Sequence, residues 1–233
     1  MPVLQALQLG KQYNGKPTLS NLNLLIYKGE IFCLLGQNAA GKTTTINLFL
    51  GFTDATSYKT CINDVEVKSN ETATQKFMAY IPEVVQLYGN LSGVENLDFF
   101  SRMAGFTYSK DLLSGFLTKA GLQTEAHHKR LSTFSKGMPQ KVGIAIALAK
   151  NADVILLDEA TSSLDPKATV EFTAICKELA ADGKTIFMAT HDIFNSVNVG
   201  IRIGIMKQSE LVHTLYTKDI TANALQQLYF ETI

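Results

Sequence analysis

The chain has 233 residues, of which 46% are hydrophobic and 18% are charged, as is typical of a folded protein that can bury a sizeable core. It carries 21 basic and 21 acidic residues, so no net charge would attract it to nucleic acid or to an acidic membrane surface. No apolar run approaches the ~18–20 residues that a membrane span needs, and the first residues lack the pattern of a signal peptide. We therefore expect that any function in a membrane requires another chain that spans it.

The first part of the chain is predicted to form strands that lead into a helix. Val3–Leu9 alternates apolar and polar side chains, as a half-buried strand does, and Leu22–Ile26 is a second predicted strand. Ile31–Leu35 is unbroken and apolar, the pattern of a strand that is covered on both faces in a parallel sheet. A helix is predicted from about Lys42, and Met78–Ile81 is a further short strand.

Residues 84–150 change in character from strands to helices. Ser92-Gly93-Val94-Glu95 is a capping box, which predicts the start of a helix at this point. A second helix is predicted where apolar side chains recur at helical spacing, at Leu112, Leu113, Phe116 and Leu117. The pattern indicates a helical segment inserted into an α/β chain.

Alternation of strands and helices resumes after the helical segment. Val154–Leu157, Thr185–Thr190 and Ile201–Met206 are predicted strands, and Asp165 before Pro166 predicts the N-cap and first residue of a helix. No linker or repeat divides the chain, so we expect a single domain over residues 1–233. Its α/β core comprises residues 1–83 and 151–233, and its helical subdomain comprises residues 84–150.

The segment Gly36–Thr43 carries the motif G-x-x-x-x-G-K-[ST] between a predicted strand and a predicted helix. Backbone N–H groups of such a loop, together with the helix N-terminus, can hold phosphate oxygens. Lys42 is expected to reach the β- and γ-phosphates, the Thr43 hydroxyl to bind Mg²⁺, and Thr44 to add a phosphate contact. The alternative is a glycine-containing turn without a ligand. The nucleotide-binding residues predicted here are Gly36, Gln37, Asn38, Ala39, Ala40, Gly41, Lys42, Thr43 and Thr44.

Two adjacent acidic residues, Asp158 and Glu159, follow the predicted strand Val154–Leu157. Ligands of an open parallel sheet bind beyond the carboxyl ends of its strands, so both carboxylates are expected to lie beside the Gly36–Thr43 loop. A solvated turn or a helix N-cap is the alternative for two neighbouring acids.

Two segments resemble motifs of ABC-type ATPases. The signature motif is similar to Phe134-Ser135-Lys136-Gly137-Met138-Pro139-Gln140, and the Walker B motif is similar to the later apolar strand that ends in Asp158-Glu159. Together with the phosphate loop, the resemblance covers nearly the whole chain. It implies an α/β fold with a P-loop NTPase core (a RecA-like parallel sheet), an antiparallel β-subdomain and an inserted helical subdomain. It also implies Mg²⁺-dependent hydrolysis of ATP to ADP and phosphate in a head-to-tail pair of subunits.

The resemblance assigns a metal-binding role to Asp158, and catalytic roles to Glu159 and His191 together with Lys42. Asp158 would hold Mg²⁺ through water, and Glu159 would orient and deprotonate the attacking water. His191 arrives about thirty residues after Glu159, where the family has a switch histidine that contacts the γ-phosphate. A histidine on the surface after a strand is the alternative for His191.

The resemblance also implies residues that bind nucleotide away from the phosphate loop. Ser135 and Gly137 match the signature positions that close on the γ-phosphate bound to the partner subunit. Tyr13 matches the aromatic residue that stacks on adenine, although an edge residue of the first strand is an alternative.

The chain departs from the family pattern at several positions. Ala39 stands where the family usually has Gly, which costs about 1 kcal/mol if the position needs a positive φ. Glu83 replaces the usual Gln and is expected to bind Mg²⁺, sense the γ-phosphate and link the site to the groove that faces the partner. The signature reads F-S-K-G-M instead of L-S-G-G-Q, a variant similar to those of ABC-2 type transporters.

These features predict the ATP-binding subunit of a membrane transporter, driving export from the cytoplasmic face through separate integral membrane permease subunits. We also expect a second ABC ATPase subunit as a partner, in a homodimer. No nucleic-acid partner is expected. Val84–Tyr88 offers apolar side chains where the family docks a coupling helix, unless these residues are core. Two alternatives stay open, namely a soluble ABC-type ATPase in an assembly process and a nucleotide-binding scaffold with weak turnover.

Overall fold

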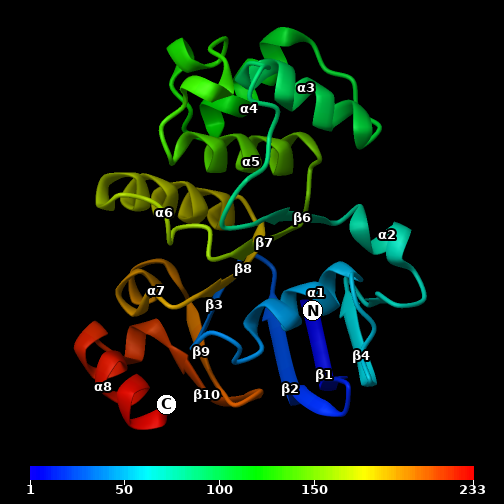
Figure 1. The fold of residues 1–233 in the computed structure, drawn as a ribbon, viewed down its shortest axis with the longest axis vertical. Helices are drawn as coiled ribbons and strands as arrows, with labels where there is room; N and C mark the ends of the chain where they lie inside the picture. Colours follow the sequence, from blue (N-terminus) through cyan, green and yellow to red (C-terminus); the bar gives the residue numbers. More distant parts are fainter.

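The computed structural model describes all residues 1–233 and contains two sheets with helices around them (Figure 1). The larger sheet has six strands in the order β10-β9-β3-β8-β7-β6. Its strands from β9 to β6 are parallel, and β10 pairs antiparallel with β9 at one edge. These strands are β3 (Ile31–Gly36), β6 (Met78–Ile81), β7 (Val154–Asp158), β8 (Thr185–Thr190), β9 (Arg202–Lys207) and β10 (Glu210–Tyr216).

The smaller sheet is antiparallel, with the order β2-β1-β4-β5. Helix α1 (Lys42–Leu50) contributes Ile46 and Phe49 to the core between this sheet and one face of the larger sheet. The antiparallel strands are β1 (Pro2–Tyr13), β2 (Lys16–Tyr27), β4 (Ser57–Ile62) and β5 (Val65–Glu66). The predicted α/β architecture with a separate antiparallel sheet is confirmed.

A second core covers the opposite face of the larger sheet. Because β3, β7 and β8 lie between the two cores, every residue of these strands is buried. The unbroken apolar run Ile31–Leu35 predicts this for β3. The helices that contribute to this core include α6 (Pro166–Ala181), α7 (Ile193–Val199) and α8 (Ala222–Thr232).

Three helices lie together at one end of the molecule (Figure 1), namely α3 (Gly93–Met103), α4 (Lys110–Lys119) and α5 (Met138–Ala149). The predicted capping box of α3 is present, because Glu95 N–H donates to Ser92 Oγ at 3.3 Å and Ser92 N–H donates to Glu95 Oε2 at 2.7 Å. Val142 of α5 belongs to the same buried cluster as Leu157 of β7, so the helices and the large sheet share a core. The division at residues 83 and 150 stays a prediction.

The remaining helices are short. They are α2 (Glu71–Gln75) and the 3-10 helices Thr124–Ala126, Leu131–Thr133 and Thr217–Asp219. Across residues 1–233, no helix combines the length and the apolar character that crossing a membrane requires.

Candidate functional site

The loop between β3 and α1 curls over the carboxyl end of the sheet. Gly41 has φ 110°, and a Cβ at this position would lie 2.7 Å from the carbonyl oxygen of Thr18, so only glycine fits. Ala39 has φ 64°, which confirms that this position is left-handed. An alanine there costs about 1 kcal/mol relative to glycine, and the loop adopts its conformation despite that cost.

The N-terminus of α1 presents free hydrogen-bond donors. Its N-cap, Gly41, has no side chain to cap the helix, and no carbonyl in the chain accepts from the N–H groups of Lys42, Thr43 and Thr44. These groups, together with the positive end of the helix dipole, form an anion site. The observed backbone therefore fits the phosphate-binding role that the motif predicts.

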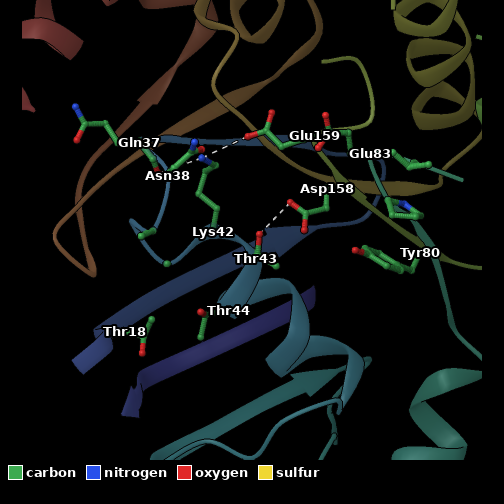
Figure 2. A pocket seen from close by; sticks show the side chains of 14 residues that line it. Thr18, Gln37, Asn38, Lys42, Thr43, Thr44, Tyr80, Glu83, Asp158 and Glu159 are labelled. Carbon is green, nitrogen blue, oxygen red and sulfur yellow. Dashed lines mark hydrogen bonds and ion pairs between the residues drawn. The ribbon is translucent and has the colours of Figure 1, made fainter. Parts of the chain in front are cut away.

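A cavity of about 460 Å³ opens beside this loop, and Figure 2 shows the side chains that line it. It brings together residues from distant parts of the sequence. Lys42 is its single basic residue, whereas Glu83, Asp158 and Glu159 are acidic. The lining residues are Thr18, Gln37, Asn38, Ala39, Gly41, Lys42, Thr43, Thr44, Tyr80, Pro82, Glu83, Val84, Asp158 and Glu159.

Lys42 is held in place by the loop that it follows. Its ammonium Nζ donates to the carbonyl oxygens of Gly36 at 2.6 Å and of Gln37 at 3.3 Å, and the residue is only 5% exposed. The same Nζ lies 3.4 Å from Glu159 Oε1, an oxygen that accepts no hydrogen bond within the chain. A buried cation therefore faces one carboxylate across the cavity.

Asp158 and Thr43 form the oxygen-rich side of the cavity. Thr43 Oγ1 donates to Asp158 Oδ1 at 3.3 Å, a contact drawn as a dashed line in Figure 2. Burial raises the pKa of the Asp158 carboxyl, an effect that the Thr43 hydrogen bond opposes and the neighbouring Glu159 charge reinforces. A divalent cation would relieve this excess of negative charge.

The residues present fit Mg²⁺, because carboxylate and hydroxyl oxygens are its preferred protein ligands. No cluster of three or more His, Cys, Asp or Glu side chains forms a complete metal site by itself. Mg²⁺ keeps several waters and uses few protein ligands when phosphates bind it. Thr43, Asp158 and Glu83 are the side chains that would hold it.

Glu159 occupies a constrained position between Lys42 and His191. Its φ is 52°, a left-handed conformation that a non-glycine residue rarely adopts outside functional or tightly held sites. Its N–H donates to the carbonyl of Ala189 at 2.9 Å, and its Oε2 lies 2.8 Å from His191 Nδ1. The predicted proximity of Asp158 and Glu159 to the phosphate loop is confirmed, and His191 joins the same cluster.

The Glu83 side chain points into the same region from the segment after β6 (Figure 2). Ser162 Oγ donates to Glu83 Oε1 at 2.9 Å, and Gln140 Nε2 donates to the Glu83 carbonyl oxygen at 3.1 Å. No motif or local pattern predicted these two contacts. Thr18 was also missed, because only the position of β2 relative to the phosphate loop brings it to the cavity.

Two sets of predicted binding residues lie outside this cavity. Ser135 and Gly137 line a separate cavity of about 190 Å³. Tyr13 lies at the end of β1, with Lys11 Nζ 4.7 Å from its ring centroid and its hydroxyl 3.5 Å from Thr53 Oγ1. A single chain thus does not bring the signature residues to the phosphate loop.

Comparisons with known proteins agree with this geometry. Residues 19–162 match the family model described as ABC transporter. The linearmycin resistance ATP-binding protein LnrL of Bacillus subtilis is 30% identical over 212 residues, which cover 90% of this chain and 68% of LnrL. The bacitracin transport ATP-binding protein BcrA of Bacillus licheniformis is 31% identical over 214 residues, which cover 91% of this chain and 69% of BcrA.

Solved structures of ABC transporter subunits have the same fold as this chain. One described as the ATP binding subunit of an ABC transporter has a TM-score of 0.85 at 26% identity, covering 98% of both chains. A dimeric structure of the ATP-binding cassette MJ0796 bound to ADP and Pi has a TM-score of 0.81 at 25% identity, covering 92% of this chain and 98% of that chain. The whole fold, including the helical segment, therefore has close structural counterparts.

Proposed function

Because this chain belongs to the ABC transporter family, we propose that it hydrolyses ATP, with Mg²⁺, as the ATPase subunit of a membrane transporter. Separate integral membrane permease subunits would form the transport path and hold the chain at the cytoplasmic face. The names of LnrL and BcrA refer to linearmycin resistance and bacitracin transport, which favours export as the direction of transport for this chain.

The observation that carries this proposal is the position of Glu159 between Lys42 and His191. Lys42 Nζ lies 3.4 Å from Oε1 and His191 Nδ1 lies 2.8 Å from Oε2 of the same carboxylate. Incoming phosphates carry more negative charge than one carboxylate, so Lys42 would turn from Glu159 to the β- and γ-phosphates. Oε1 would then be free to act as a base, while His191 keeps the carboxylate oriented.

The reaction follows from these positions. The free N–H groups of Lys42, Thr43 and Thr44 would hold phosphate oxygens. Glu159 would take a proton from a water, whose oxygen attacks the γ-phosphorus while the bond to the ADP oxygen breaks. Bound Mg²⁺ would neutralise charge on the phosphates. Thr43, Asp158 and Glu83 would hold that ion.

We also propose that a second copy of the chain completes the site. Ser135 and Gly137 lie apart from the phosphate loop within one chain, so their predicted contact with a γ-phosphate requires a partner. The dimeric structures of the MJ0796 cassette support this arrangement.

A groove of about 550 Å³ supports the association with a permease. Ten of its fifteen lining residues are hydrophobic, and two of them, Phe52 and Val84, are exposed in the isolated chain. It begins directly after Glu83, with Val84, Val85 and Leu87, so a partner seated there would touch the segment that borders the nucleotide cavity.

The test is to purify the chain with the membrane proteins that it binds in its native cells and to measure ATP hydrolysis. We expect a multi-spanning membrane protein to co-purify and to change the rate of hydrolysis. Hydrolysis with only soluble partners would favour an assembly ATPase instead. ATP binding without turnover, alone and with partners, would favour a scaffold.

A further inference from the structure

A short hydrogen-bonded path joins Glu83, Ser162 and Glu159 at the edge of the cavity. Ser162 Oγ lies 2.9 Å from Glu83 Oε1 and 2.8 Å from the carbonyl oxygen of Glu159. The N–H of Ser162 donates to that same carbonyl at 3.0 Å. Ser162 is close to Glu159 in the sequence, whereas Glu83 comes from a distant part of the chain. The hydrogen bond between Ser162 and Glu83 is therefore a long-range contact.

The Ser162 hydroxyl has one proton and two acceptors within reach. A hydrogen bond to a carboxylate is roughly twice as strong as one to a neutral carbonyl, and the Glu159 carbonyl already accepts from the N–H of Ser162. The hydroxyl therefore favours Glu83. This bond engages Oε1 of Glu83 and leaves its other carboxylate oxygen available to a ligand in the cavity.

Glu83 is also held from the opposite side. Gln140 on α5 is 3% exposed, and its Nε2 donates to the carbonyl oxygen of Glu83 at 3.1 Å. Ser135 and Gly137 lie immediately before the same helix. The backbone of Glu83 is thus attached to the helix that follows the signature residues, while its side chain is attached to the backbone that follows Glu159.

We propose that Ser162 is a positioning residue, which fixes the Glu83 carboxylate and couples it to the backbone of Glu159. Displacements of α5 would reach Glu159 through Gln140, Glu83 and Ser162. This inference rests on the proposed function for the role of Glu159, whereas the hydrogen bonds of Ser162 are observed directly in the structure. The backbone of Glu159 is left-handed, so a contact that restrains its carbonyl group also restrains the direction of its side chain.

The first test is a double-mutant cycle on ATP hydrolysis. Ser162→Ala should lower kcat by about 3- to 10-fold, the range expected for loss of one hydrogen bond, without changing the Kd for ATP. Ser162→Thr keeps the hydroxyl and should restore kcat. In a Glu83→Ala background Ser162→Ala should have no further effect, because the acceptor is gone. In a Glu83→Gln background, the amide oxygen accepts without charge, so the effect should be smaller but present.

The second test uses amide hydrogen exchange in the nucleotide-free chain. Ser162→Ala and Glu83→Ala should each speed exchange in the segment 160–165. Ser163→Ala is the matched control, because the Ser163 hydroxyl is exposed and makes no hydrogen bond, and it should leave exchange unchanged.

Two outcomes would overturn the proposal. An equal fall in kcat in the wild-type and Glu83→Ala backgrounds would show that Ser162 acts without Glu83. Unchanged exchange in Ser162→Ala would show that the bond does not order the segment. If no form hydrolyses ATP, the proposed function fails, and the exchange measurement still decides whether the bond exists.

Discussion

Lys42 has two kinds of partner at the residue scale, and they have different consequences. The carbonyls of Gly36 and Gln37 fix its position, whereas Glu159 balances its charge. We expect Lys42→Ala to abolish productive ATP binding, because the cation that meets the β- and γ-phosphates is lost. It also leaves Glu159 without its counter-ion. Binding of a fluorescent ATP analogue, with ATP competition, measures the effect.

The matched control for Lys42→Ala is Lys129→Ala, which removes an exposed lysine that makes no ion pair. We expect it to bind ATP like the wild type. Unchanged ATP affinity in Lys42→Ala would refute the assignment of the phosphate loop.

Ala39 allows a prediction about backbone strain. Its φ of 64° is one that glycine adopts freely, so Ala39→Gly should raise the free energy of unfolding by up to about 1 kcal/mol. Ala40 has no positive φ, so Ala40→Gly should instead lower it by about 0.5–1 kcal/mol. Urea denaturation of the three forms compares them. Lower stability in Ala39→Gly would mean that the left-handed backbone is not a source of strain.

Individual site residues could be predicted wherever a motif fixes their place relative to a strand end. Lys42, Asp158 and Glu159 meet in one cavity because β3 and β7 belong to one parallel sheet and end on the same side. The hydrogen bond from Ser162 to Glu83 could not be predicted. It depends on how the segment after β6 lies against the segment after β7, which no local pattern in the sequence specifies.

At the element scale, strands that are buried on both faces were the most predictable. β6 and β8 begin and end at the predicted residues, and β3 and β7 extend one residue beyond the predicted ranges. β10 and α8 were missed, because these peripheral elements bury few side chains and their hydrophobic periodicity is weak. β4, which pairs with both β1 and β5, was also missed. β10 has no fully buried residue, and α8 buries only Leu225 and Tyr229.

The apolar groove that includes Val84, Val85 and Leu87 allows a prediction for Phe52, which follows α1. Phe52, just beyond α1, lines the groove and is 66% exposed. We expect Phe52→Ala to weaken binding of the permease by about 10-fold or more, since exposed aromatic anchors carry much of an interface's binding free energy. Binding of the purified chain to permease in detergent or nanodiscs measures it.

A matched control for the groove exists on α8. Phe230 is also 66% exposed but lies outside the groove, so Phe230→Ala removes the same side chain from a different surface. It should bind the permease like the wild type. Equal weakening of permease binding by both variants would indicate a general loss of fold or solubility. Unchanged binding by Phe52→Ala would show that the permease does not dock in this groove.

At the scale of the whole molecule, the helical segment and the large sheet share one buried core. Ile144 and Ala145 of α5 belong to the same buried cluster as Ile155 and Leu157 of β7. We therefore expect a single cooperative unfolding transition, with equal calorimetric and van't Hoff enthalpies. Two separate transitions would mean that residues 84–150 fold independently of the rest.

Glu159 is proposed to act as the base in a site shared by two chains. The most direct measurement is size-exclusion chromatography of Glu159→Gln with Mg²⁺-ATP, with turnover assayed in parallel. The amide cannot take a proton from water but still fits the site, so this variant should bind ATP, hydrolyse it very slowly and elute as a dimer. Near-wild-type turnover would remove Glu159 from the base role, and a monomer with ATP bound would contradict the shared site.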